Sequence, residues 1–372
     1  MDSIDLEKSV SNFDDLFTVD KVDYLNIMPF RLVTVHEKDL WNHYVHSCKM
    51  YDFYHTWYYH SLDKSGEPIL FVFQREETFI VFPLIKRLIE GTSFSDFTSV
   101  YGYAGPISNV DFETMSQAVM EDFKLAFLLF LKDGQNVSVF CRLHPIINHD
   151  LLVTKFGSMV NSGKTIAINL ISTIEEQRSK YRRQFRSKIR QLREKGYYLK
   201  QADTTAEISE FTKIYNENMA RVKADSYYHF DENYFVKMLN SDDFKSSVLL
   251  LYVGDQITCG AYVTFSNNIM QFHLAATNNN FLHEGPMKLL IDEATLIGRN
   301  NNMAYLHLGG GVGGKEDSLF DFKAGFSDLI LNFNTWRFIA NNTVYDELVL
   351  KKKNAGNNKS DFFPLYRDSN NL

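Results

Sequence analysis

The chain has 372 residues, of which 45% are hydrophobic and 15% aromatic, which is enough apolar material for the cores of two domains of ordinary size. Its formal net charge of −7 argues against a protein that coats nucleic acid, because neutralising many phosphates requires a basic face. The 3 cysteines lie far apart without a CxxC pair, so neither a disulfide framework nor a cysteine zinc site is expected.

The N-terminal segment predicts no export signal. It is acidic and lacks a basic stretch followed by an apolar one, which a secretory signal requires. No run of about 18 uninterrupted apolar residues follows, so no membrane-spanning helix is expected. We therefore expect a cytoplasmic protein without a transmembrane segment.

The first half of the chain predicts a β-hairpin followed by a helix and a further strand. Two apolar, β-rich runs at 69–73 and 78–84 flank a polar segment typical of a hairpin turn. A helix is predicted over 112–132 and a strand over 137–141.

Between the halves, the sequence predicts a basic amphipathic helix over 173–195. Thr173 and Glu176 form a capping box at its start, and Gly196 is typical of its end. The lysines and arginines on its outer face are Arg178, Lys180, Arg182, Arg183, Arg186, Lys188, Arg190, Arg193 and Lys195. They indicate either a solvated helix face or a phosphate site, which the planar fork of arginine favours.

The second half repeats the order of elements seen in the first. Strands are predicted at 248–253, 257–265 and 269–276, separated by tight-turn pairs. A helix over 286–300 and a strand over 305–308 follow. Because a meander, a helix and a strand occur twice, the sequence predicts two copies of one α/β unit.

A glycine-rich segment at 309–316 follows the last of these strands. It matches a GxGxxG pattern and most of a P-loop, but Glu316 stands where a P-loop has its magnesium-binding hydroxyl. Too little chain follows for the parallel sheet of a nucleotide-binding domain, so nucleotide hydrolysis and hydride transfer are excluded. The glycines indicate either a turn or a close approach of backbone to a ligand.

Catalytic motifs based on a nucleophile or a metal are absent from the sequence. There is no GxSxG elbow and no HExxH motif, and the histidines have no ligand spacing. Neither covalent catalysis nor a metal cofactor is expected. Lys323, which lies between Phe322 and Gly325, is a candidate cation for stabilising an oxyanion if its surroundings are partly desolvated.

Several short motifs occur in an order that is more specific than any one of them. YLHLGG at 305–310 precedes FKAGF at 322–326, and YGYAGP at 101–106 and RLHP at 142–145 lie in the first half. The basic residues 182–190 and the MAR sequence at 219–221 lie between them. Over most of its length the chain therefore resembles the FemAB-type transferases and their relatives in bacterial capsule and envelope loci.

This resemblance implies an α/β (α+β) fold of two tandem GNAT-like domains with mixed, largely antiparallel sheets. The first would comprise 1–165, and the second 166–340 with the basic helix 173–195. The last segment, about 341–372, would return to complete the first domain. A cleft between the halves would bring an amine acceptor to an activated acyl donor.

The resemblance also implies roles for single residues. Lys323 would stabilise the oxyanion, and Phe322 would shape the donor site. The candidates for binding acceptor phosphates are Arg221, Tyr228, Arg182 and Arg186. The donor side would contain Gly309, Gly310, Gly311, His273 and Glu284. The proton of the attacking amine could leave through a phosphate of the acceptor, a water, or a side chain such as His273 or Glu284, and the sequence does not choose among these.

Three functions remain open from the sequence. The first is an N-acyltransferase that uses acyl-CoA to modify a nucleotide- or lipid-linked amino sugar in capsule, lipopolysaccharide or related envelope synthesis. The second is an aminoacyl-tRNA-dependent transferase that extends a peptidoglycan peptide. Net acidity and the lack of a paired helical arm count against tRNA, whereas the single glycine in the loop 277–286 weakens the match to a coenzyme A loop. The third is a non-catalytic module that binds a sugar nucleotide or an envelope-synthesis partner. No DNA partner is expected.

Overall fold

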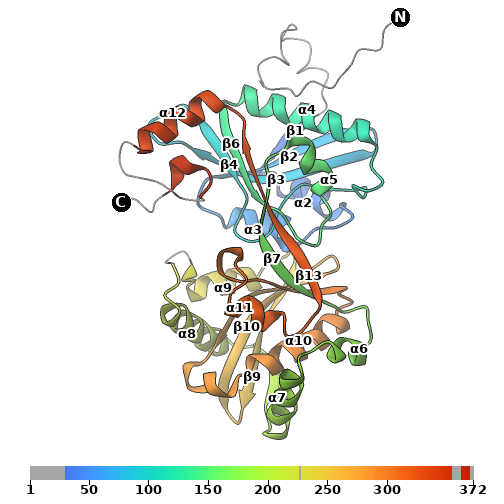
Figure 1. The fold of residues 1–372 in the computed structure, drawn as a ribbon, viewed down its shortest axis with the longest axis vertical. Helices are drawn as coiled ribbons and strands as arrows, with labels where there is room; N and C mark the ends of the chain where they lie inside the picture. Colours follow the sequence, from blue (N-terminus) through green and yellow to red (C-terminus); the bar gives the residue numbers. More distant parts are fainter. Residues whose placement is uncertain (1–29, 226–227, 354–361, 369–372) are drawn as a thin grey trace, which may run out of the picture.

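The computed structural model describes residues 30–225, 228–353 and 362–368. These residues form an upper and a lower half joined by a central pair of long strands (Figure 1). The N-terminal segment, on which the expectation of no export signal rests, lies outside the described residues, as do parts of the predicted segment 341–372. No helix in the described ranges is both long and apolar enough to cross a membrane.

All strands of the described residues belong to one sheet in the order β1-β2-β3-β4-β6-β13-β7-β12-β11-β10-β9-β8, with β5 paired to β3. The strands are β1 (Phe30–Thr34), β2 (Glu67–Arg75), β3 (Thr78–Leu88), β4 (Ser95–Thr98), β5 (Ile107–Ser108), β6 (Asn136–Arg142), β7 (Met159–Asn169), β8 (Tyr198–Gln201), β9 (Lys245–Val253), β10 (Gln256–Ser266), β11 (Ile269–Thr277), β12 (Tyr305–Gly310) and β13 (Leu329–Ile339). Among these strand pairs, only β4 with β6 and β11 with β12 are parallel. The predicted α/β class with a mixed, largely antiparallel sheet is confirmed.

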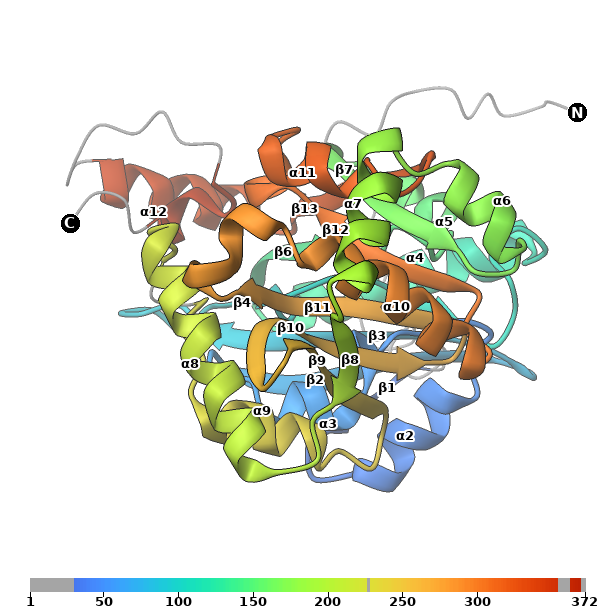
Figure 2. The same ribbon diagram turned by 90° about the horizontal axis from the view of Figure 1, so that it is seen from below.

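Helices cover both faces of this sheet (Figure 2). The α-helices are α2 (Lys38–His46), α3 (Trp57–Ser61), α4 (Gln117–Asp133), α5 (Asp150–Val153), α6 (Ile174–Ser179), α7 (Arg183–Glu194), α8 (Thr205–Arg221), α9 (Glu232–Leu239), α10 (Met287–Asn300), α11 (Ser318–Lys323) and α12 (Asn342–Lys353). Short 3-10 turns occur at η2 (Phe53–His55), η3 (Thr154–Phe156), η5 (Asn279–Glu284), η6 (Val312–Gly314) and η7 (Leu365–Arg367).

The two central strands, β7 and β13, join the halves. β13 pairs with β6 of the first half and with β7, while β7 pairs in turn with β12 of the second half. In Figure 1 both strands run from the upper half into the lower one. The boundary predicted at 165/166 falls inside β7, and the one at 340/341 falls just after β13. The division into domains at these residues stays a prediction.

The apolar core continues from one half into the other. In the first half, α4 packs phenylalanines onto the sheet, and the same cluster extends through Phe53 and Tyr54 to α8 and α9 of the second half. A second cluster lies on the opposite face of the second half, where α7 and α10 cover the strands. The shared core and the shared sheet hold the halves in one arrangement.

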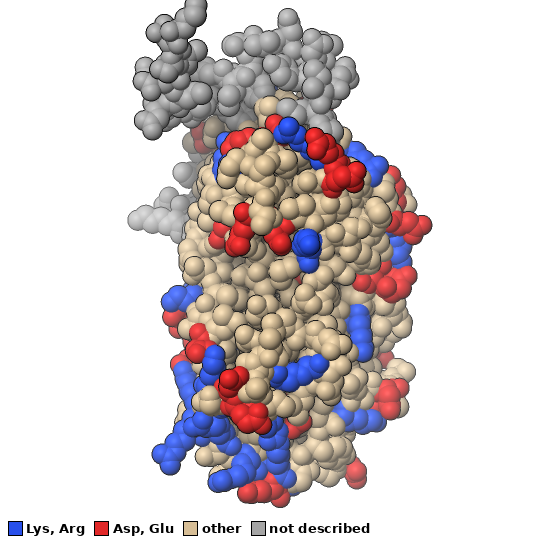
Figure 3. Space-filling view, turned by 90° about the vertical axis from the view of Figure 1, so that its right-hand side faces the viewer, with Lys and Arg blue, Asp and Glu red and all other residues tan. Residues whose placement is uncertain are grey.

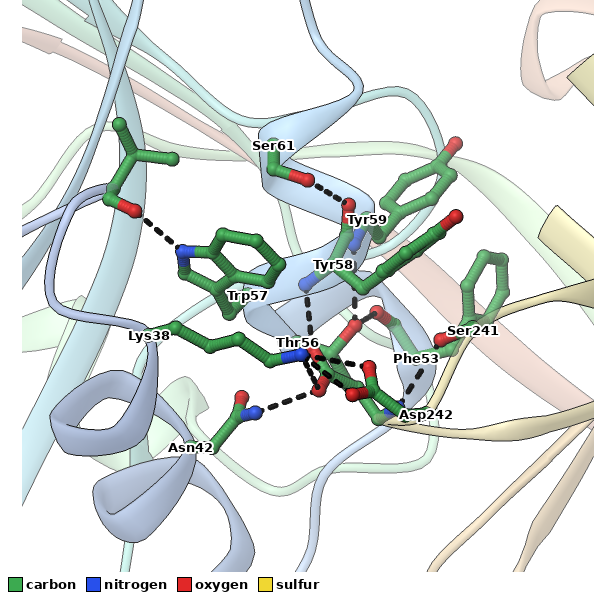
Figure 4. A network of polar contacts seen from close by, with 12 residues as sticks. Lys38, Asn42, Phe53, Thr56, Trp57, Tyr58, Tyr59, Ser61, Ser241 and Asp242 are labelled. Atoms are coloured by element: carbon green, nitrogen blue, oxygen red, sulfur yellow. Dashed lines mark hydrogen bonds and ion pairs between the residues drawn. The ribbon is translucent and has the colours of Figure 1, made fainter. Parts of the chain in front are cut away.

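A polar contact also ties the halves together on the side of α2. The ammonium of Lys38 on α2 lies 2.7 Å from Asp242, and the buried carboxylate of Asp243 accepts hydrogen bonds from Asn42 and from the backbone N–H of Tyr58. Figure 4 shows these first-half residues converging on the turn that precedes β9.

The basic helix predicted over 173–195 is two helices, α6 and α7. The capping box of Thr173 and Glu176 is present at the start of α6. The helix breaks at Arg182, whose backbone N–H donates to the carbonyl of Gly325 at 2.9 Å instead of continuing the helical ladder. A tertiary contact therefore replaces a local one, which the periodicity of the sequence does not reveal.

Candidate active site

The second half contains an opening between two parallel strands. β11 and β12 pair at Ile269–Tyr305, Met270–Leu306 and Gln271–His307, and they have no further pairs along the rest of their length. In the first half, by contrast, β4 and β6 are followed by a bridge between Ala104 and Leu143. The opening therefore belongs to the second half, and the end of β12 forms one of its edges.

Two glycines at the end of β12 are required by its geometry. The register between β12 and β7 shifts between His307 and Gly309, and Gly309 has a φ of +73°, where side chains are disfavoured. A Cβ on Gly310 would lie 2.5 Å from the carbonyl oxygen of Lys164, which is too close for any other residue. β12 can therefore bulge at the opening only because both residues lack side chains.

The rest of the glycine-rich segment forms a turn that packs on the protein itself. A Cβ on Gly311 would lie 2.1 Å from the carbonyl oxygen of Lys315, and one on Gly314 would lie 2.0 Å from that of Ser162 on β7. Asp317 accepts a hydrogen bond from the N–H of Val312 at 3.0 Å and caps α11. The turn interpretation therefore suits Gly311, whereas Gly309 faces the opening.

Lys323 lies at the end of α11 beside this bulge. Its ammonium donates to the carbonyl of Gly310 at 2.7 Å, and the side chain is half-buried. It forms no ion pair within the described part of the chain. Burial lowers the pKa of Lys323 to about 8, against an opposing effect of the Asp317 charge. The arrangement holds an unpaired ammonium in a partly dry site.

The FKAGF motif is explained by its packing on α7. Phe326 is fully buried against Tyr181 and Phe185, with ring centroids 5.2 and 5.0 Å apart. A Cβ on Gly325 would lie 2.2 Å from the Phe185 ring, so only glycine fits. Phe322 packs on the same ring at 5.6 Å. These contacts fix the end of α11 and so place the Lys323 ammonium.

The other predicted donor-side residues lie in different surroundings. His273 on β11 is bound on both ring nitrogens, by the hydroxyls of Tyr54 at 3.0 Å and Tyr234 at 3.2 Å. Burial lowers its pKa to about 3, which makes it a poor proton acceptor at neutral pH. Glu284 on η5 forms an ion pair with Lys195 at 2.6 Å, which lowers its pKa. Neither side chain contacts Lys323.

The predicted phosphate-binding residues also separate. Arg182 is held by both oxygens of Asp321, at 2.8 and 2.6 Å, so its charge is already paired. Arg186 donates to the carbonyl of Ser179 and faces solvent. Arg221, at the end of α8, donates to Asn218 at 2.6 Å.

Of the acceptor-side predictions, Tyr228 contacts a residue of the first half. Its ring contacts that of Tyr101 edge to face, with centroids 5.7 Å apart. Arg142 lies near both Tyr101 and Tyr103: burial raises the pKa values of these tyrosines, and the Arg142 charge acts to lower them. Arg142 forms no ion pair with any described residue. A phosphate bound near Tyr101 would therefore meet an available guanidinium.

Sequence reasoning assigned no role to Tyr103, although its motif was noted. Tyr103 lies between Gly102 and the bridge residue Ala104, and its ring contacts His307 of β12 at 5.0 Å and Phe333 of β13 at 5.3 Å. The flanking Gly102 has a φ of +109°. Gly105, two residues after Tyr103, has a φ of +125°. The two glycines were the available signal in the sequence, but only the tertiary structure shows what Tyr103 reaches.

Comparisons with known proteins agree with this geometry. Residues 179–323 match the family model for an acetyltransferase (GNAT) domain. Among solved structures, FemX matches with a TM-score of 0.66 at 12% identity, covering 86% of this chain and 99% of FemX. A conserved protein of unknown function from Bacteroides thetaiotaomicron VPI-5482 matches with a TM-score of 0.55 at 10% identity, covering 84% of this chain and 99% of that one. The search of curated protein sequences found no match.

The matched domain spans α7, the opening between β11 and β12, and Lys323. The chain is therefore an acyltransferase of the GNAT fold. Over both halves, its fold is similar to that of FemX.

Proposed function

We propose that this acyltransferase moves an acyl group from acyl-CoA to the amine of an amino sugar or a related precursor in capsule, lipopolysaccharide or similar envelope synthesis. The observation that carries the proposal is the unpaired ammonium of Lys323 beside Gly309, at the strand opening of the matched GNAT domain. A fixed cation in a partly dry site stabilises negative charge far better than it would in water.

In the proposed reaction, the nitrogen of the acceptor attacks the carbonyl carbon of the thioester. A C–N bond forms, and the carbonyl oxygen takes the negative charge, which the Lys323 ammonium stabilises. The C–S bond then breaks, the thiolate leaves, and the proton lost by the amine balances it to give an amide and a free thiol. Because His273 and Glu284 are held by other groups, an acceptor phosphate or a water is the better-supported route for that proton.

The acceptor is proposed to bind on the first-half side of the opening. Tyr228 and Tyr101 supply two contacting aromatic rings there, and Arg142 supplies the nearby guanidinium. Such a set suits a phosphorylated sugar, because arginine pairs with phosphate oxygens through its planar fork.

The outer face of α7 favours the second candidate donor, aminoacyl-tRNA. Most basic residues around α7 are paired with carboxylates, but Arg183, Arg186 and Lys188 form no ion pair with the described residues. Figure 3 shows lysines and arginines gathered on the lower half of the molecule. A shallow groove there is lined by Arg182, Arg183, Gln184, Ser187, Lys188 and Gln191. This is the feature that a phosphate backbone would contact.

A thermal-shift titration distinguishes the donors, because a ligand that binds only the folded state raises the melting temperature. We expect acetyl-CoA and free CoA to stabilise the protein, with little dependence on salt. Stabilisation by bulk aminoacyl-tRNA that falls steeply with salt, together with no response to CoA, would instead establish the tRNA-dependent reaction. No response to either donor would argue for the non-catalytic module.

The pKa of Lys323 predicts a pH dependence for the reaction. The ammonium is the stabilising form, and it is lost as pH rises through about 8. The maximal rate should therefore fall above that pH, by about tenfold per unit once Lys323 is mostly neutral. Arginine keeps its charge far above the pH at which Lys323 loses its proton, so the Lys323→Arg variant should lose this alkaline limb even if its rate is lower. An unchanged limb in that variant would assign the titration to another group.

A further inference from the structure

The position beside Gly309 is bounded by two polar atoms. A Cβ built on Gly309 would lie 3.2 Å from the hydroxyl oxygen of Tyr103 and 3.5 Å from the ammonium nitrogen of Lys323. Apart from the two chain neighbours of Gly309, no other described atom lies within 4 Å of that point. The missing side chain of Gly309 therefore lets a hydroxyl and an ammonium from two different segments approach the same point.

Tyr103 has a proton to donate at this point. The Gly310 backbone acts to lower the pKa of this hydroxyl, as a donor facing its oxygen does, so the O–H itself can be directed elsewhere. Burial raises the pKa of Tyr103 to about 12, so the hydroxyl stays protonated throughout the range in which Lys323 is charged. Its ring is fixed by contacts with His307 and Phe333, so little ordering would be needed when a ligand binds.

We infer that the Tyr103 hydroxyl and the Lys323 ammonium form a two-donor oxyanion site at Gly309, with Tyr103 as a further catalytic residue. The inference rests on the proposed acyl transfer. The carbonyl oxygen of the acyl donor binds beside Gly309 and accepts both hydrogen bonds. Both donors keep their protons while the C–N bond forms, and they release the oxygen when the carbonyl is restored and the thiolate leaves.

The two donors come from different halves of the chain. Tyr103 follows β4 of the first half, whereas Lys323 ends α11 of the second half. Gly309, where the two donors meet, lies on β12, which adjoins β7 at the junction of the halves. The site is therefore complete only when the first half packs against the GNAT domain, which gives that half a role in the chemical step as well as in acceptor binding.

The test compares Tyr103→Phe with the matched control Tyr345→Phe. Each variant removes one hydroxyl whose oxygen faces a backbone donor, but Tyr345 lies in the separate cluster around α12. Release of thiol from acetyl-CoA, with a UDP-amino sugar as acceptor, and loss of the ester of labelled aminoacyl-tRNA are both followed. We expect Tyr103→Phe to lower kcat by about 10- to 100-fold, with KM for the donor nearly unchanged. Tyr345→Phe should match the wild type.

The double variant of Tyr103→Phe with Lys323→Met adds a second criterion. Because both groups would bind one oxygen, the fold decrease in kcat of the double variant should be smaller than the product of the two single-variant decreases. A raised KM with unchanged kcat would make Tyr103 a substrate-binding residue and overturn the inference. Equal rates for the two tyrosine variants would overturn it as well, while the proposed function stands. If the wild-type protein consumes neither donor, that result would contradict both the proposed function and this inference.

Discussion

Replacing Lys323 by methionine is expected to lower kcat by about 10²- to 10³-fold, or roughly 3–4 kcal/mol of transition-state stabilisation. Methionine keeps much of the length and apolar contact of the side chain but removes the ammonium that lies beside Gly309 and Gly310. Because the ammonium acts mainly on charge that develops in the reaction, the affinity for the donor should change little. Steady-state kinetics with separate kcat and KM values, and a donor titration followed by thermal shift, measure both quantities.

The matched control is Lys315→Met in the glycine-rich turn before α11. This lysine is exposed, and its replacement removes the same charge from the same region without touching the opening. It should leave kcat within about twofold of the wild type, as surface substitutions away from a site generally do. Equal losses in the two variants would point to a general electrostatic effect. A Lys323→Met variant that binds ligands and transfers as well as the wild type would remove the basis of the proposed mechanism.

The second large effect is expected from Trp336→Ala, which should lower the free energy of unfolding by about 3–5 kcal/mol. Trp336 on β13 is among the largest fully buried side chains, and it packs on Phe82, Phe127 and Phe156 of the first half. Its indole N–H donates to the carbonyl of Gly157 at 2.9 Å. The substitution therefore leaves a cavity and an unpaired carbonyl at the place where β13 enters the first-half core. Chemical denaturation measures the loss.

Ile330→Ala on the same strand is the control for Trp336→Ala. Ile330 is 48% exposed and lies where β13 pairs with β7, so its truncation should cost no more than about 1 kcal/mol. If both variants lost the same small amount, β13 would not be anchored in the first half as the structure shows. An unfolding transition that splits into two steps in Trp336→Ala would show that the halves depend on this strand for their cooperativity.

Features set by neighbouring residues could be predicted from the sequence. Alternating apolar runs separated by turn pairs predicted the hairpin β2–β3 and the meander β9–β10–β11, because strand register in a hairpin depends on the turn between its strands. The capping box of Thr173 and Glu176 was found for the same reason. Lys323 was identified through a motif whose glycine and phenylalanines pack on α7, so the residue types reflect that contact.

Features that depend on distant pairing were decided by the tertiary structure. β7 and β13 were not predicted, since neither is part of a hairpin with a neighbour in sequence, and they pair with each other across about half of the chain. The ion pair of Arg182 with Asp321 and the two tyrosine partners of His273 join residues far apart in the chain, so the sequence did not reveal them. Tyr103 reaches Gly309 only because these long-range pairs bring the halves together.

The sequence by itself therefore predicted the repeated α/β units, the class of chemistry and the cation that we propose for it. These depend on local periodicity and on short motifs, which residues close in the chain specify. Only the tertiary structure decided which side chains share the site. Contacts between residues more than a hundred positions apart depend on many weak interactions acting together, and no single segment specifies them. The proposed two-donor site at Gly309, with Tyr103 from the first half and Lys323 from the second, depends on those long-range contacts.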